Sequence, residues 1–371
     1  MREVVIIDGC RTPVAKRKGA LADWRPDDLA ALILKELIKR TGVGKQDVED
    51  VIMGCVTQIG EQGGNIARAA SLIAGFPVHV PGVTIDRQCG SSQQAVHFAA
   101  QAIASGDMDI VIAGGVESMT RSSMGSNLAK SSPLLTDQYE IVNQGISAEK
   151  IADKWNLSRT ELDAYAYSSH ERALNAMKAG YFNGEMVGVN DFSADEGPRN
   201  DTSLAALGNL RPVFKEDGKI TAGNASQMSD GASAVLVMSR EKADELGLTP
   251  KARIVARTVV GSDPTLMLTG PIAATEQVLK RTGLDIEDID LYEVNEAFAS
   301  VPLAWLADTG ADPAKLNVNG GAIALGHPLG ATGTKLLVSL LYELERRGGR
   351  YGLLAICEGM GTANATIIER L

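Results

Sequence analysis

The stretch Leu29-Ala-Ala-Leu-Ile-Leu-Lys-Glu-Leu-Ile-Lys-Arg-Thr-Gly42 carries the pattern that organises this chain, because its ending recurs. It is an amphipathic helix pattern that ends in Arg-Thr-Gly, and an acidic turn and the strand-like run Val51-Ile-Met53 follow it. Arg281-Thr-Gly283 likewise precedes the acidic turn 286–290 and the apolar pair Leu291-Tyr292. The shift between the copies is 241 residues, from Arg40 to Arg281.

The same shift relates two further pairs of segments. It aligns the helix expected after Cys89 with one that begins near Ala331, and the apolar run 110–113 with the run 351–354. A constant shift through four elements predicts two homologous α/β halves. The apolar runs are continuous rather than alternating, which indicates central strands covered by helices on both faces.

A more polar segment separates the copies. Residues 118–219 contain two helical patterns, at 146–155 and 159–179, and loop-like composition at 194–200. We therefore expect a first half made of 1–117 with 220–248, an inserted loop domain at 118–219, and a second half at 249–371.

Composition excludes several classes of protein. The 371 residues carry a formal net charge of −10 without a basic stripe, which argues against a nucleic-acid partner. Four cysteines without C-x-x-C spacing predict neither a zinc site nor a disulfide framework, and indicate a reducing compartment. No apolar run reaches the roughly 18 residues of a membrane helix, and no signal peptide precedes the first strand-like run. We expect a cytoplasmic protein without a metal.

Cys89 is the first candidate for chemistry. It follows the strand-like run 83–85 and precedes a helix expected at 91–105, whose apolar stripe contains Ala95, Phe98, Ala99, Ala102 and Ile103. The helix N-terminus would stabilise a thiolate and lower the pKa of the thiol, so Cys89 is predicted to be a nucleophile. The alternative is a small apolar residue that fills a turn.

Three further residues extend this candidate site. His327 lies between Gly326 and Pro328 in a rigid turn expected to be reachable by solvent, where it can act as a base; alternatively, it is a turn residue satisfied by the backbone. Cys357 ends a buried strand before a Gly-rich turn whose N–H groups could bind an oxyanion, although taken alone this position favours a buried packing cysteine. Asn295 follows another strand and could instead cap a helix.

Taken together, these motifs resemble those of the thiolase family, which includes acetyl-CoA acetyltransferase and 3-ketoacyl-CoA thiolase. The similarity spans almost the whole chain in the family's order. The matching segments are Arg11-Thr-Pro13, the Cys89 segment, Ala113-Gly-Gly-Val-Glu-Ser118, Leu210-Arg-Pro212, Thr221-Ala-Gly-Asn-Ala-Ser226 with Asp230-Gly231, Asn295-Glu-Ala-Phe-Ala299, Gly326-His-Pro-Leu-Gly330 and the Cys357 turn.

The resemblance implies a duplicated αβαβα layered fold and an acyltransferase that makes or breaks the Cα–Cβ bond of a 3-ketoacyl-CoA. It implies that Cys89 carries the acyl group, that His327 activates Cys89, and that Cys357 exchanges the α-carbon proton. One oxyanion site would use His327 and a water on Asn295. The other would use the N–H groups of Cys89 and Gly359.

The resemblance also implies how the substrate is held. Acyl-CoA and CoA are expected as substrates and no cofactor as permanently bound, in a homodimer or homotetramer. A net charge of −10 requires a local positive patch for the CoA phosphates. The residues expected near CoA or the acyl group are Ser226, Arg199, Ala297 and Phe298, with Arg211, Lys215 and Lys219 as further basic candidates.

Three departures from the family pattern concern the substrate. Met360 replaces the middle glycine of Cys-x-Gly-Gly-Gly, which is expected to reshape the acyl pocket but to preserve the oxyanion role. Asn143-Gln144 stands where His-Met is common, and Gly197 replaces the histidine of His-Pro-Arg. Gln144 in place of the pocket-lining methionine weakens a transfer of short-chain acetoacetyl-CoA specificity, and Gly197 is expected to loosen the nucleotide contacts.

Other classes of protein remain as alternatives. A ketoacyl synthase shares the duplicated fold but does not need Cys357. A non-catalytic acyl-CoA-binding or scaffold protein need not keep all four site residues. A nicotinamide-dependent oxidoreductase is disfavoured because the Gly-rich run 320–326 lacks G-x-G-x-x-G and its acidic partner.

Overall fold

A computed structural model describes residues 2–371 and shows a mixed sheet of ten strands. The strand order is β4-β3-β5-β6-β1-β7-β10-β9-β8, and β2 pairs with β6 beside this path. The first half supplies β1 (Val4–Arg11), β2 (Ala15–Lys16), β3 (Asp50–Gly54), β4 (Gly82–Ile85), β5 (Ile110–Ser118) and β6 (Ser229–Ser239). The second half supplies β7 (Ala252–Gly261), β8 (Leu291–Val294), β9 (Tyr351–Glu358) and β10 (Thr362–Arg370).

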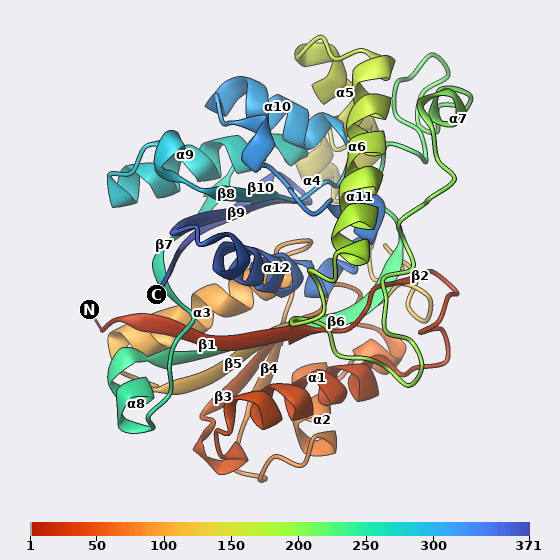
Figure 1. Cartoon of the computed structure of the whole chain (residues 1–371). Coiled ribbons are helices and arrows are strands. Elements are labelled where there is room, and N and C mark those ends of the chain that lie inside the picture. Colours follow the sequence, from red (N-terminus) through yellow and green to blue (C-terminus); the bar gives the residue numbers. More distant parts are fainter. Residues whose placement is uncertain (1) are drawn as a thin grey trace.

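Helices form three layers around these two half-sheets (Figure 1). The first half contributes α1 (Pro26–Thr41), α2 (Ile66–Ile73), α3 (Ser91–Ser105) and α8 (Arg240–Glu245). The second half contributes α9 (Gly270–Thr282), α10 (Ser300–Thr309), α11 (Ala322–Leu325) and α12 (Thr332–Arg347). Short 3₁₀ helices lie at Lys45–Asp47, Gly60–Gln62, Met267–Thr269, Ile286–Asp288, Pro313–Lys315 and Leu329–Ala331.

The layers follow the order helix, sheet, helix, sheet, helix. Helices α1 and α2 pack on the outer face of the first half-sheet, and α9 and α10 on that of the second. Helices α3 and α12 lie between the half-sheets, where one apolar cluster combines residues of both helices with residues of both half-sheets. The predicted αβαβα arrangement is therefore confirmed.

The duplication is visible in element boundaries. Helices α1 and α9 both end at a glycine in the left-handed conformation, Gly42 with φ 71° and Gly283 with φ 72°. A 3₁₀ helix follows each of them, and β3 and β8 come next. Helices α3 and α12 begin at Ser91 and Thr332, which are separated by the shift that relates Arg40 to Arg281. The repeated Thr-Gly pair thus ends equivalent helices in both halves.

One expectation for α3 is wrong. The sequence pattern puts Phe98 on the buried stripe of the helix, but its side chain is 39% exposed, whereas Val96 and Ala100 are fully buried. Because helix α3 lies in the central layer, it buries a wider arc of its surface than the single stripe of a surface helix, and Phe98 lies outside that arc. Phe98 consequently projects from the side that neither half-sheet covers.

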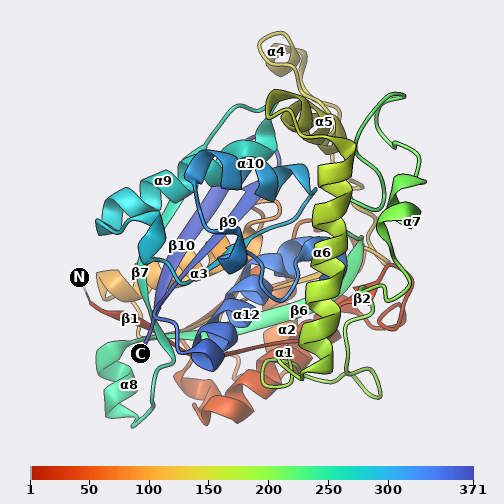
Figure 2. The same cartoon turned by 45° about the horizontal axis from the view of Figure 1, so that its top comes forward.

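The chain between β5 and β6 forms the inserted region. It contains α4 (Pro133–Thr136), α5 (Gln144–Lys154), α6 (Arg159–Lys178) and α7 (Leu204–Gly208). Figure 2 shows α6 running along the side of both half-sheets, with α5 near one of its ends and α7 beside it. Helix α6 packs against α11 through Ala173, Ala176 and Leu325, which brings the insertion onto the second half.

No helix between residues 2 and 371 combines the length and the apolar character that a bilayer crossing requires.

The contact between α3 and α12 generates a prediction for stability. A Cβ atom added at Gly333 would overlap the backbone nitrogen of Gln93 and would lie 2.8 Å from its Cβ. Gly333→Ala should therefore push the central helices apart and lower the free energy of unfolding by about 1–3 kcal/mol, the usual cost of overpacking. Urea denaturation measures this change.

Gly208→Ala in α7 is the matched control, because an added Cβ there meets no atom within 4 Å. This control should leave stability unchanged or raise it slightly through helix propensity. Equal unfolding curves for the two variants would contradict the tight packing of α3 on α12.

Candidate active site

Segments from both halves of the chain converge on one buried site. Cys89 precedes the helix cap Gly90 of α3, and Cys357 lies near the end of β9. Asn295 directly follows β8, and its Nδ2 lies 3.5 Å from Nε2 of His327. The two cysteines are close enough that a charge on Cys357 raises the pKa of Cys89. The Asn295 N–H bonds Ala355, two residues before Cys357 on β9, and so links the Asn295–His327 pair to the pair of cysteines.

Burial is the largest influence on the pKa of the Cys89 thiol. Its side chain is 5% exposed, and burial, followed by the nearby Cys357 and Glu358, raises the thiol pKa well above its ordinary value. The expectation that the helix N-terminus lowers this pKa is wrong, because loss of solvent outweighs the helix dipole. Cys89 is a neutral thiol in the resting protein and needs a base to become a nucleophile.

His327 is suited to be that base. Burial and the charge of Lys335 lower its pKa to about 3, so the imidazole is neutral at physiological pH. Its Nδ1 lies 2.6 Å from Oγ1 of Thr332, whose hydroxyl donates to the Pro328 carbonyl at 3.0 Å. Thr332 therefore accepts a hydrogen bond from Nδ1–H, which keeps the proton on Nδ1 and leaves a lone pair on Nε2. The expected solvent-reachable position is wrong, because His327 is 4% exposed.

The turn that carries His327 is fixed by Glu117, at the end of β5. The buried Glu117 carboxylate accepts hydrogen bonds from the N–H of Gly330 at 2.9 Å and from those of Val56 and Thr57 at 2.9 and 3.0 Å. The side chain of Gln62 donates a further bond at 3.0 Å. One carboxylate thereby joins the second half's histidine turn to the first half's strands.

Asn295 is not a helix cap. The nearest helix, α10, begins at Ser300 and has Ala299 at its cap position. The Asn295 N–H instead donates to the Ala355 carbonyl at 3.1 Å, which orients the residue toward His327. Its buried Oδ1 has no hydrogen-bond partner among residues 2–371. An unpaired polar atom at this position can hold a water or a substrate oxygen.

Two backbone N–H groups beside the cysteines are also free. Neither the N–H of Cys89 nor that of Gly359 donates to another group in the described part of the chain. Gly359 faces Gln88, since an added Cβ would lie 3.0 Å from its Oε1. Met360 has a φ of 65°, in the left-handed region that favours glycine, and its side chain is 45% exposed. The turn therefore keeps glycine-like backbone geometry while presenting a bulky side chain.

Three of the expected substrate-binding residues lie together. The Ser226 N–H donates to the Ala297 carbonyl at 2.9 Å, and Ala225 forms a bridge with Phe298. The Phe298 ring meets the edge of Phe214 at a centroid distance of 6.0 Å. This contact joins the segment after β8 to the inserted region.

The basic candidates are less uniform. The Arg199 N–H donates to Nδ1 of His170 at 3.2 Å, which ties the loop of Arg199 to α6. Lys215 and Lys219 both approach Asp153, at 3.6 and 2.9 Å, so one carboxylate partly offsets their charge. Arg211 has no ion-pair partner in the part of the chain that the structure describes. The arrangement does not gather these groups into a single free cationic patch.

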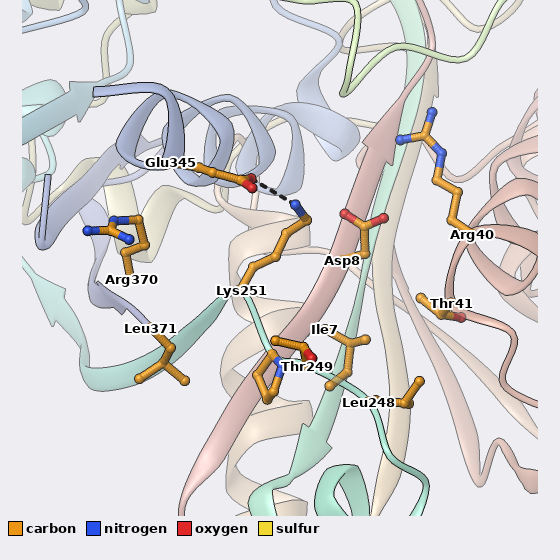
Figure 3. A pocket seen from close by; sticks show the side chains of 11 residues that line it. Ile7, Asp8, Arg40, Thr41, Leu248, Thr249, Lys251, Glu345, Arg370 and Leu371 are labelled. Atoms are coloured by element: carbon orange, nitrogen blue, oxygen red, sulfur yellow. Dashed lines mark hydrogen bonds and ion pairs between the residues drawn. The ribbon is translucent and has the colours of Figure 1, made fainter. Parts of the chain in front are cut away.

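A surface cavity of about 430 Å³ lies elsewhere and contains none of the candidate residues (Figure 3). It is bounded by both signs of charge, including Arg40 and Asp8, and Lys251 pairs with Glu345 across it at 2.8 Å. The site of interest therefore remains the buried junction between the halves.

Several functional groups at this junction were not singled out from the sequence. Thr332 sets the tautomer of His327, and Glu117 fixes the turn that carries it. Glu296 accepts hydrogen bonds from Tyr165 and Ser169 of α6 at 2.9 and 2.7 Å, which holds the insertion in place. Glu117, Glu296 and Glu358 all lie inside motifs noted in the sequence, so the available signal was a charged residue within an otherwise apolar segment.

Comparisons with known proteins agree with this geometry. Residues 4–241 match the family described as thiolase, N-terminal domain, and residues 248–370 match thiolase, C-terminal domain. The steroid 3-ketoacyl-CoA thiolase FadA6 of Mycobacterium tuberculosis is 52% identical over 388 aligned residues, covering 100% of this chain and 95% of that protein. The 3-ketoacyl-CoA thiolase of Bacillus subtilis is 43% identical, with full coverage of both chains.

A solved structure extends the comparison to three dimensions. The crystal structure of the Bacillus anthracis acetyl-CoA acetyltransferase superposes with a TM-score of 0.93 at 40% identity, covering 100% of this chain and 99% of that one. Matches to both domain families, to enzymes covered over almost their whole length and to this fold lead to one conclusion: the chain belongs to the thiolase family of acyltransferases.

Proposed function

We propose that this protein makes or breaks the Cα–Cβ bond of a 3-ketoacyl-CoA through a thioester on Cys89. The observation that supports this most strongly is the shared buried site of Cys89, Cys357, His327 and Asn295. A non-catalytic acyl-CoA-binding protein lacks support, since the relatives are named as enzymes. The substrates are acyl-CoA and CoA, without a resident cofactor.

Cleavage begins with proton transfer from the Cys89 thiol to Nε2 of His327. The thiolate attacks the 3-keto carbon, a C–S bond forms, and the Cα–Cβ bond breaks. The departing acetyl-CoA enolate takes a proton from the Cys357 thiol. The Cys357 thiolate then takes the proton of the incoming CoA thiol, and the CoA sulfur attacks the thioester. Cys89 leaves as a thiolate and recovers its proton from His327, the shortened acyl-CoA is released, and condensation is the reverse sequence. Two thiols are needed because nucleophile and acid act on different carbons.

The negative charge that develops during these steps requires two separate donors. The free N–H groups of Cys89 and Gly359 form one oxyanion site. A water on the unpaired Oδ1 of Asn295, together with His327, forms the other. Ser226 and Arg199 contact CoA, while Ala297 and Phe298 lie near the acyl group. The segment 118–219 acts as an inserted domain over this site, between a first half of 1–117 with 220–248 and a second half of 249–371.

The acyl-enzyme is directly testable. Incubation with acetyl-CoA should add one acetyl group to the peptide that contains Cys89, as measured by mass spectrometry. Cys89→Ala should lose both this adduct and the CoA-dependent cleavage of 3-ketoacyl-CoA. Cys357→Ala should still be acetylated but should lose carbon–carbon bond chemistry.

Cys10→Ala is the control, because Cys10 is buried against α1, with its Sγ 3.8 Å from the Ile33 carbonyl, outside the site. This control should retain adduct formation. A folded protein that never becomes acetylated would favour the scaffold alternative, and normal turnover by Cys357→Ala would remove the acid/base role of that cysteine.

The tautomer of His327 offers a second test. Thr332→Val keeps the shape of the side chain but removes the oxygen that accepts from Nδ1–H. Because the lone pair on Nε2 is then no longer enforced, kcat/KM for thiolysis should fall by about 10–100-fold, as for other residues that orient a reactive histidine.

Thr334→Val is a matched control in the same helix, since the Thr334 hydroxyl bonds Ser233 rather than His327. Similar activity losses for the two threonine variants would show that the effect is loss of packing and not of the tautomer.

We propose a homodimer or homotetramer for the assembly. The support is a group of exposed apolar side chains around the free edge of β4, with exposed fractions of 45% for Leu72, 41% for Ile73, 82% for Val78, 41% for Val83 and 39% for Phe98. The four free, buried cysteines agree with a cytoplasmic location, which cell fractionation tests.

Sedimentation equilibrium measures the assembly. The protein should sediment at a multiple of its 39.1 kDa chain mass, and Val83→Glu should shift it toward the monomer, because a charge at this edge opposes burial. Leu246→Glu, at the end of α8, alters an equally exposed residue away from this edge and should not. A wild-type monomer would contradict the proposal.

A further inference from the structure

Glu358 is a buried acid that the reaction described above does not use. It follows Cys357 directly, as the last residue of β9, and its side chain is fully buried. A carboxyl group in such a position is costly unless it is neutral or well supplied with partners. The groups that contact the Glu358 carboxyl therefore indicate its role.

The carboxyl group connects the two turns that carry the cysteines. Its Oε2 accepts a hydrogen bond from the Thr362 hydroxyl at 2.5 Å. Its Oε1 lies directly against Gly90, the residue after Cys89, so that a Cβ atom there would overlap it. The contact joins the end of β9 to the start of α3. Glu358 therefore links the strand end that carries Cys357 to the turn that carries Cys89.

The side-chain amide of Asn364 adds a partner with two possible orientations. One of its polar atoms lies 3.1 Å from Oε1 of Glu358, and the other lies 3.3 Å from the backbone N of Gln94. With its NH₂ toward Glu358, the amide donates to a carboxylate and accepts from Gln94. This orientation satisfies both ends of the amide, whereas the reverse orientation would place the NH₂ against the Gln94 N–H and the C=O against the carboxyl oxygen.

The charged and titratable groups that face Glu358 are Arg87, Asp86 and the two cysteines. Burial raises the pKa of Glu358 to about 8, Asp86 raises it further, and Thr362 and Arg87 counteract part of this shift. Conversely, the negative charge of Glu358 raises the pKa of both Cys89 and Cys357. Both the protonation state of Glu358 and its effect on the thiols therefore change near neutral pH.

We propose that Glu358 is a positioning residue that joins the two cysteine turns and, by gaining or losing its proton, controls how readily both thiols react. This proposal rests on the proposed roles of Cys89 and Cys357. Below about pH 8, Glu358 is a neutral acid and does not oppose thiolate formation. As the pH rises and Glu358 ionises, its charge opposes the loss of each thiol proton. The rise of thiol reactivity with pH is thereby flattened above neutrality.

Glu358→Gln removes the charge of the side chain but keeps its shape, so it tests the effect of the charge alone. The rate of Cys89 alkylation by iodoacetamide, followed by peptide mass between pH 6 and pH 9, should be the same in wild type and variant at pH 6. At pH 9, the variant should react about tenfold faster, the factor for a difference of one pKa unit. Glu245→Gln in α8 is an exposed control with the same change of side chain and should follow wild type throughout.

A second variant tests the same idea if Glu358→Gln fails to fold. Thr362→Val removes a donor that favours the carboxylate, so the pH at which the alkylation rate flattens should move upward. A rate ratio between Glu358→Gln and wild type that stays constant from pH 6 to pH 9 would overturn the proposal, and so would an unmoved profile in Thr362→Val. Alkylation needs no turnover, so failure of acyl transfer in the earlier test leaves this result interpretable.

Discussion

The close contact between the His327 turn and the sheet of the first half is the constraint on which the rest of the site depends. An added Cβ at Gly115 would overlap the Gly330 carbonyl oxygen, and one at Gly330 would lie 2.7 Å from the Cα of Cys55. Backbone can approach backbone this closely only where side chains are absent. The Glu117 carboxylate then binds the Gly330 N–H in the gap. The turn that carries the histidine of one half is thus held against the strands of the other, near the start of the helix that follows Cys89.

This contact also removes solvent from the site, which determines the resting state of its acids and bases. Burial raises the pKa of Cys89 well above its ordinary value and that of Cys357 to about 12, and lowers that of His327 to about 3. All three groups are consequently neutral before substrate arrives. A thiolate–imidazolium pair is therefore not stored in the free protein. Charge would develop only where the free N–H groups and Asn295 can meet it.

Glu296 and Glu358, the acids that follow Asn295 and Cys357, have different roles in the structure. Glu296 is satisfied by hydroxyl groups of α6 and by Asn317 at 3.0 Å, so it fastens the insertion to the second half. Glu358 follows Cys357 and lies against Gly90, with fewer donors and a pKa raised to about 8, which is the environment of a titrating group. Met360, two residues later, keeps the backbone of a glycine while exposing its side chain. The second cysteine turn thus combines a titrating acid with an exposed, bulky side chain.

The sequence by itself determined the duplicated α/β architecture and the residues gathered at the site, because repeated helix ends such as Gly42 and Gly283 and chemically unusual motifs are local properties of the chain. It could not determine the protonation of those residues. The dipole of α3 indicated an acidic Cys89, and the turn of His327 indicated exposure, but both groups are covered by segments distant in sequence. Burial, and the contacts of Glu117 with the His327 turn and of Glu358 with the Cys89 turn, exist only once the two halves pack together. Tertiary structure alone therefore decided how the site is charged.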